Sequence, residues 1–112
     1  MAYENIILEN DGKVSLITIN RPQSLNALNA KTISELSGVL DEITKDENVR
    51  SVIITGSGEK SFVAGADIKE FSDFGSAAAE ELARNGQNIL FNKIENLNKP
   101  VIAAVKGFAL GG

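Results

Sequence analysis

Cysteine and histidine are both absent from the 112-residue sequence. Without them, the chain alone cannot form a disulfide, a zinc–thiolate site, a cysteine nucleophile or a Ser-His-Asp triad. The lack of cysteine is compatible with a reducing compartment, and we expect a cytoplasmic location.

Basic charge and long apolar runs are also scarce. Lys and Arg total 11 against 15 Asp and Glu, which gives a formal net charge of −4 and a pI of about 4.8. Binding to nucleic acid or to an anionic membrane surface needs clustered Lys and Arg, so we expect neither partner. No apolar run approaches membrane-spanning length, and the first residues, Met1 to Glu4, do not have the pattern of a signal peptide.

The segments that are present indicate one α/β domain. "NIILENDGKVSLITIN" (residues 5–20) predicts two strands around a turn at Asp11-Gly12. "NRPQSLNALN" (20–29) then predicts a loop, and Asn29 is suited to cap the helix that begins just after it. The apolar face of that helix recurs at helical spacing and comprises Ile33, Leu36, Val39, Leu40 and Ile43.

Two further strands and a second helix complete the pattern. "SVIITG" (51–56) is a continuous β-branched run, which predicts a strand covered on both faces, and "VIAAV" (101–105) predicts another buried strand. Between them we expect a helix over much of residues 77–97. Its apolar side would comprise Leu82, Ile89, Leu90, Ile94 and Leu97. The order hairpin, helix, strand, helix, strand is typical of the α/β class.

Two Gly/Ala-rich segments could carry chemistry: "VAGAD" (63–67) and "GFALGG" (107–112). Small residues leave backbone N–H groups uncovered, and two such donors aimed at one point form an oxyanion hole. On composition alone, tight strand-to-helix turns with nothing bound are the better explanation. Neither "GSGEKS" (56–61) nor "GFALGG" has the spacing of a phosphate-binding or dinucleotide-binding loop, so we interpret both as turns.

Taken together, "NRPQSLNALN", "GSGEKSFVAGADIKEF" and "NKPVIAAVKGFALGG" closely resemble the crotonase (enoyl-CoA hydratase/isomerase) superfamily, and within it the bacterial short-chain enoyl-CoA hydratases. The resemblance covers essentially the whole chain. It implies a crotonase-like (ClpP/crotonase) core of stacked strand–helix units. Residues 1–112 would be the N-terminal part of that domain, ending before its C-terminal part.

The resemblance also implies site residues. Ala66 and Gly112 would donate the two oxyanion-hole N–H groups to a thioester carbonyl. The residues that would contact the CoA portion or lie near the substrate are Ser24, Leu25, Ala64, Ala66, Asp67, Ile68 and Lys69. Several have a simpler explanation, because Asp67 could cap a helix and Lys69 could be a solvated surface charge. We expect Phe62 and Phe108 to be core residues.

The implied activity is the reversible addition of water to the double bond of a 2-enoyl-CoA thioester. No metal or redox cofactor is implied, and CoA is part of the substrate. In the family two glutamates handle the water and the α-proton, and both lie beyond the position of Gly112. We therefore expect this chain alone to be catalytically inactive.

Other functions remain open at this point. Another acyl-CoA enzyme of the superfamily, such as a double-bond isomerase or a 3-hydroxyacyl-CoA dehydratase, would share the same segments. A non-catalytic CoA-binding fragment and a purely structural α/β fragment are further alternatives. The resemblance implies a homo-oligomer, a trimer or a dimer of trimers, or else a second chain that carries the missing C-terminal half.

Overall fold

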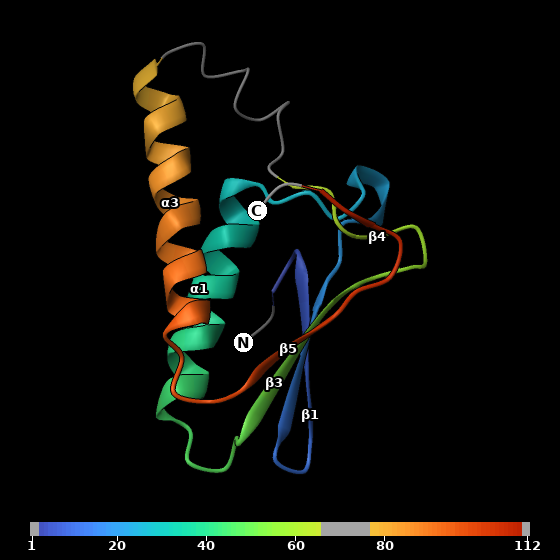
Figure 1. Cartoon of the computed structure of the whole chain (residues 1–112), viewed down its shortest axis with the longest axis vertical. Coiled ribbons are helices and arrows are strands. Elements are labelled where there is room, and N and C mark those ends of the chain that lie inside the picture. The colour runs from blue at the N-terminus through green and yellow to red at the C-terminus, as the bar shows by residue number, and fades with distance from the viewer. Residues whose placement is uncertain (1–2, 66–76, 111–112) are drawn as a thin grey trace.

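The computed structural model describes residues 3–65 and 77–110, and within these ranges it is an α/β fold. A four-stranded sheet has the order β1-β2-β3-β5, and two helices lie together on one face of it (Figure 1). Strands β1 and β2 are antiparallel, whereas β2–β3 and β3–β5 are parallel. The elements are β1 (Ile6–Asp11), β2 (Val14–Ile19), α1 (Ala30–Lys45), β3 (Ser51–Gly56), α3 (Ala77–Glu95) and β5 (Val101–Ala104).

The first hairpin turns at Gly12 and Lys13. Asp11 is still paired with Val14, and Gly12 adopts a left-handed conformation with φ 62°. The predicted hairpin is confirmed, and its turn lies one residue further along the chain than expected. Glycine suits this position because a side chain is disfavoured at positive φ.

Helix α1 begins and packs as its sequence predicts. The Asn29 side chain accepts a hydrogen bond from the backbone N–H of Thr32 at 2.9 Å, which satisfies one of the unpaired donors at the helix start. All the apolar residues predicted for its inner face are buried, and they pack in one core with Ile17 of β2 and Val52 of β3.

Helix α3 packs against α1 and completes this layer. Leu90 is 1% exposed, and Ile94 and Leu97 are partly buried against the core, as expected. The prediction for Ile89 is wrong, because its side chain is 56% exposed. The next residue along the helix, Leu90, faces the core instead. Leu82 lies outside the residues whose side chains are described.

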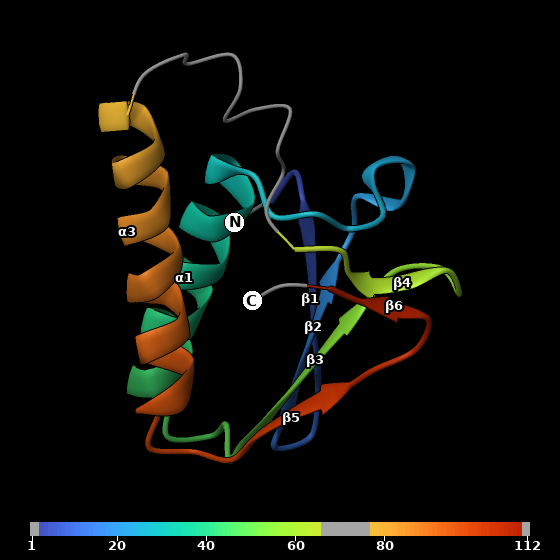
Figure 2. The same cartoon turned by 45° about the horizontal axis from the view of Figure 1, so that its top comes forward.

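Strands β3 and β5 are less covered than the sequence indicates. Along β3, buried Val52 and Ile54 alternate with half-buried residues such as Ile53. The predicted burial of "VIAAV" is wrong: Ile102 is 54% exposed and Val105, just beyond β5, is 56% exposed. Both corrections have one cause, since α1 and α3 cover the same face of the sheet and β5 lies at its edge (Figure 2).

A second, two-stranded parallel sheet was not predicted. It pairs β4 (Ser61–Val63) with β6 (Phe108–Ala109) next to the end of β3 (Figure 2). Phe62 packs against the core as expected, but Phe108 is 56% exposed, so its assignment to the core is wrong. None of the helices in the described ranges is long and apolar enough to cross a membrane.

Candidate functional site

Strand β4 brings the first loop (residues 20–29) against the first Gly/Ala-rich segment. The backbone N–H of Ala64 donates to the carbonyl of Leu25 at 3.2 Å, and the N–H of Leu28 donates to the carbonyl of Gly65 at 2.8 Å. These two bonds tie the loop that leads into α1 to the residues just before position 66.

Strand β6 brings the second Gly/Ala-rich segment to the other side of β4. The N–H of Phe108 donates to the carbonyl of Lys60 at 3.0 Å, and the N–H of Leu110 donates to the carbonyl of Val63 at 3.1 Å. The two segments that composition singled out therefore run side by side, as two converging N–H donors would require.

The first loop has an unusual backbone. One turn of 3-10 helix, η1 (Pro22–Ser24), is followed by Leu25 and Asn26 with φ of 52° and 57°. Two consecutive non-glycine residues in the left-handed region are uncommon and carry strain. The Asn26 side chain holds this conformation, because its Oδ1 accepts the N–H of Arg21 at 2.9 Å and its Nδ2 donates to the carbonyl of Ser61 at 2.9 Å.

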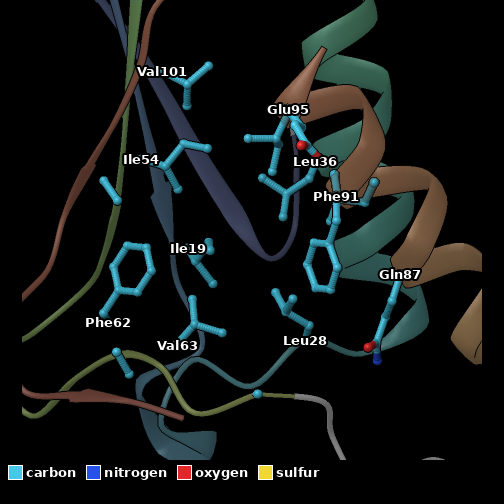
Figure 3. A pocket seen from close by; sticks show the side chains of 15 residues that line it. Ile19, Leu28, Leu36, Ile54, Phe62, Val63, Gln87, Phe91, Glu95 and Val101 are labelled. Atoms are coloured by element: carbon cyan, nitrogen blue, oxygen red, sulfur yellow. The ribbon is translucent and has the colours of Figure 1, made fainter. Parts of the chain in front are cut away.

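A cavity of about 400 Å³ lies between α3 and the two sheets, and Phe62 and Phe91 lie on opposite sides of it (Figure 3). Gly65 and Ala109 border it, so it adjoins both Gly/Ala-rich segments. Its polar lining comes from Gln87 and Glu95 of α3. The other lining residues are apolar: Ile19, Leu28, Leu36, Ile54, Val63, Leu90, Ile94, Val101 and Ala103.

Only part of the predicted site falls within the described residues. Ser24 is half-buried in η1, Leu25 is 39% exposed beside it, and Ala64 is half-buried. The bond between Ala64 and Leu25 brings this part of the site together, and it also means that the Ala64 N–H is already used within the chain. The predicted residues outside the described ranges are Ala66, Asp67, Ile68, Lys69 and Gly112.

Sequence reasoning missed two polar residues at this site. Asn26 and Ser61 are each 1% exposed, although an asparagine in a loop and a serine after a turn usually face solvent. In the sequence, burial of Asn26 is indicated only by its position between two apolar residues, Leu25 and Ala27. Such a position is common for exposed asparagines too. Within the described ranges, no cluster of three or more Asp and Glu side chains is placed to hold a metal ion.

Comparison with known proteins identifies relatives of the whole chain. A family profile for enoyl-CoA hydratase/isomerase matches residues 9–112. The chain is 53% identical over 112 residues to the short-chain-enoyl-CoA hydratase of Clostridium acetobutylicum, covering 100% of this chain and 42% of that protein. It is 51% identical over 112 residues to the crotonyl-CoA hydratase of Syntrophomonas wolfei, covering 100% and 43%.

Solved structures agree. The crystal structure of an enoyl-CoA hydratase from Bacillus anthracis matches with a TM-score of 0.92 at 36% identity, over 95% of this chain and 41% of that chain. An enoyl-CoA hydratase/carnithine racemase from Magnetospirillum magneticum matches with a TM-score of 0.91 at 31% identity, over 98% and 42%. The predicted crotonase-like fold is confirmed, and the chain spans less than half the length of these relatives.

Proposed function

Because the chain belongs to the enoyl-CoA hydratase/isomerase family, we propose that residues 1–112 are the N-terminal part of a crotonase-fold domain whose complete form hydrates 2-enoyl-CoA thioesters. The curated relatives named as short-chain-enoyl-CoA and crotonyl-CoA hydratases support this assignment. The proposed role belongs to fatty-acid metabolism.

One observation carries the proposal: Val63 and Leu110 are joined by a backbone hydrogen bond of 3.1 Å. The chain reaches Ala66 soon after Val63, and Gly112 soon after Leu110. The proximity of Val63 and Leu110 supports a pair of N–H donors from the two Gly/Ala-rich segments. Each donor can then approach the same thioester oxygen, because neither carries a bulky side chain.

In the proposed reaction, a water oxygen bonds to the β-carbon of the substrate and gives up a proton. The electrons of the double bond move toward the carbonyl, which becomes an enolate whose oxygen is held by the N–H groups of Ala66 and Gly112. A proton is then added at the α-carbon. The family resemblance assigns water activation and proton delivery to two carboxylates beyond Gly112.

CoA is part of the substrate, and the proposed hydration needs no change of oxidation state and therefore no redox cofactor. The family resemblance implies no metal. Ser24, Leu25 and Ala64 would lie on the CoA side together with Asp67, Ile68 and Lys69. The acyl group would lie toward the apolar cavity that Gly65 and Ala109 border, whose volume of about 400 Å³ suits a small ligand.

The complete protein is proposed to act in the cytoplasm as a homo-oligomer, a trimer or a dimer of trimers, or with a second chain that supplies the C-terminal half. The exposed apolar side chains along β5 and β6 support a covering partner, since such a row is costly to leave in water. A double-bond isomerase or a 3-hydroxyacyl-CoA dehydratase would use the same two N–H donors, and the family description itself includes isomerases.

A joined protein tests the proposal. Residues 1–112 are fused to the part of the Clostridium acetobutylicum hydratase that lies C-terminal to its match, and hydration of crotonyl-CoA is measured. We expect turnover by the joined protein and none by the 112-residue chain. Ala66→Pro, which removes one N–H donor, should lower kcat of the joined protein by about 100-fold. A folded joined protein without turnover, or turnover by the chain alone, would contradict the proposal.

A further inference from the structure

The Asn26 carboxamide is buried and fully used. Its Oδ1 accepts hydrogen bonds from the backbone N–H of Arg21 at 2.9 Å and from the Ser57 hydroxyl at 3.3 Å. Its Nδ2 donates to the carbonyls of Ser57 at 3.0 Å and Ser61 at 2.9 Å. A carboxamide offers two donor hydrogens and two acceptor lone pairs, so every position is filled.

The Ser61 hydroxyl adds hydrogen bonds to the first loop and to β6. Its Oγ lies 2.8 Å from the carbonyl oxygen of Leu25 and 3.1 Å from that of Phe108, and its single hydrogen is shared between them. Asn26 and Ser61, which we call the polar node, therefore connect the first loop, β4 and β6 through two side chains that are each 1% exposed.

Close backbone packing gives the polar node little freedom to shift. Gly107 has φ 70°, and a β-carbon there would lie 2.1 Å from the carbonyl oxygen of Lys60. The turn before β6 is thus pressed against the turn before β4 with no side chain between them. A node that is fully hydrogen-bonded and tightly enclosed sets one spacing between the strands it joins.

We propose that the polar node positions the two Gly/Ala-rich segments relative to each other and to the first loop, so that Asn26 and Ser61 act as positioning residues for thioester binding. This inference rests on the proposed function. The node touches the carbonyls of Leu25 and Phe108. The Leu25 carbonyl also accepts the N–H of Ala64, and Leu110, two residues after Phe108, donates its N–H to the carbonyl of Val63. We expect that loss of the polar node would displace the proposed N–H donors of Ala66 and Gly112 without removing them.

Two variants break the node, and each has a matched control. Asn26→Asp keeps the side-chain shape but turns a carboxylate oxygen toward the carbonyls of Ser57 and Ser61, whereas Ser61→Ala removes only the hydroxyl. The control Asn96→Asp removes an exposed hydrogen bond of 2.9 Å, which the Asn96 Nδ2 atom donates to the carbonyl of Asn92. Ser15→Ala removes the hydroxyl of another serine that is 1% exposed, which bonds Asn10 at 2.6 Å.

Amide hydrogen exchange on the 112-residue chain tests the geometry without any ligand. In Asn26→Asp and Ser61→Ala, exchange at Leu28, Ala64 and Leu110 should rise by about tenfold or more, whereas exchange at Val52 in the main sheet should stay unchanged. If Asn26→Asp fails to fold, the milder Ser61→Ala carries the test. Equal acceleration at all four amides would overturn the proposal, because it would reveal general destabilisation.

Kinetics of the joined protein test the role in thioester binding. Both node variants should lower kcat for crotonyl-CoA by about tenfold with KM within about twofold, because a displaced donor is felt most in the transition state. The controls should match the unsubstituted protein. If the kinetics of the node variants match those of their controls, the positioning role of the node is overturned and the proposed function is not affected. An inactive unsubstituted joined protein would instead count against the proposed function, and the exchange experiment would still decide whether the node sets the geometry.

Discussion

Gly56, the last residue of β3, packs directly against the carboxamide of Asn26. A β-carbon at Gly56 would lie 2.7 Å from the Asn26 Nδ2 atom and 2.2 Å from the carbonyl oxygen of Phe62. Both distances are far below van der Waals contact, and one of the atoms belongs to backbone that cannot swing away. The end of β3 and the first loop can meet only because residue 56 has no side chain.

Gly56→Ala should therefore destabilise the fold. We expect the free energy of unfolding to fall by about 3 kcal/mol, the upper range for overpacking a well-packed site. Urea denaturation followed by circular dichroism measures this change.

Gly38→Ala is the matched control. Gly38 lies on the exposed side of α1, and a β-carbon there would have no heavy atom within 4 Å. Since alanine favours a helix over glycine, the same substitution should raise the free energy of unfolding by about 1 kcal/mol. Equal effects of the two substitutions would contradict the packing described at Gly56.

Tyr3 should make stability depend on alkaline pH. Burial raises the pKa of its hydroxyl above the ordinary 10.0, and the charge and hydrogen bond of Glu42 and the charge of Glu35 raise it further. The neutral form is thus favoured in the folded state, and this contribution is present below pH 10 and lost as the pH rises through the folded pKa. The free energy of unfolding of the unsubstituted chain should therefore fall relative to that of Tyr3→Phe over this range.

Urea denaturation of both proteins at about pH 8 and about pH 11 measures that difference. Taking the difference removes the lysines, which titrate over the same range in both proteins. A difference that is the same at both pH values would contradict the assigned environment of Tyr3.

The sequence predicts an element well where its apolar residues recur at a regular spacing and all pack against the same core. The cap at Asn29 and the inner face of α1 follow from local chemistry, and both are confirmed. Ile89 and Phe108 were misassigned because hydrophobicity alone does not say which side chains a fold leaves uncovered. In both places an apolar residue lies where no described element packs over it.

The site could be predicted only in outline. β4 and β6 are too short to give a periodic signal, so their pairing through Val63 and Leu110 was not foreseen as a sheet. The Asn26 side chain donates to the carbonyl groups of Ser57 and Ser61, which lie far along the chain. Such long-range partners are brought together by the tertiary structure, and the residues next to Asn26 in the sequence do not indicate them.

The uncovered edge at β5 should drive self-association of the 112-residue chain. Four apolar side chains at this edge are between 54% and 56% exposed: Ile102, Val105, Phe108 and Leu110. Among the described residues, no strand pairs with the outer edge of β5. We expect dimers or larger species by light scattering at micromolar concentration. Ile102→Lys should weaken the association, because a charge on an edge strand opposes pairing.

Ile89→Lys is the control, since Ile89 is also 56% exposed but lies on α3. It should leave the association unchanged. A chain that stays monomeric at every concentration, or that responds equally to both lysine substitutions, would contradict a role for the β5 edge.

The most direct test of the account is the infrared stretching frequency of the thioester carbonyl in bound crotonyl-CoA, with that carbon isotopically labelled, in the joined protein. The proposed pair of N–H donors at positions 66 and 112 would polarise the carbonyl, so the frequency should be lower than in free crotonyl-CoA and should return toward the free value in Ala66→Pro. A bound frequency equal to the free one, or a shift that Ala66→Pro leaves unchanged, would contradict the convergence of these donors on the thioester.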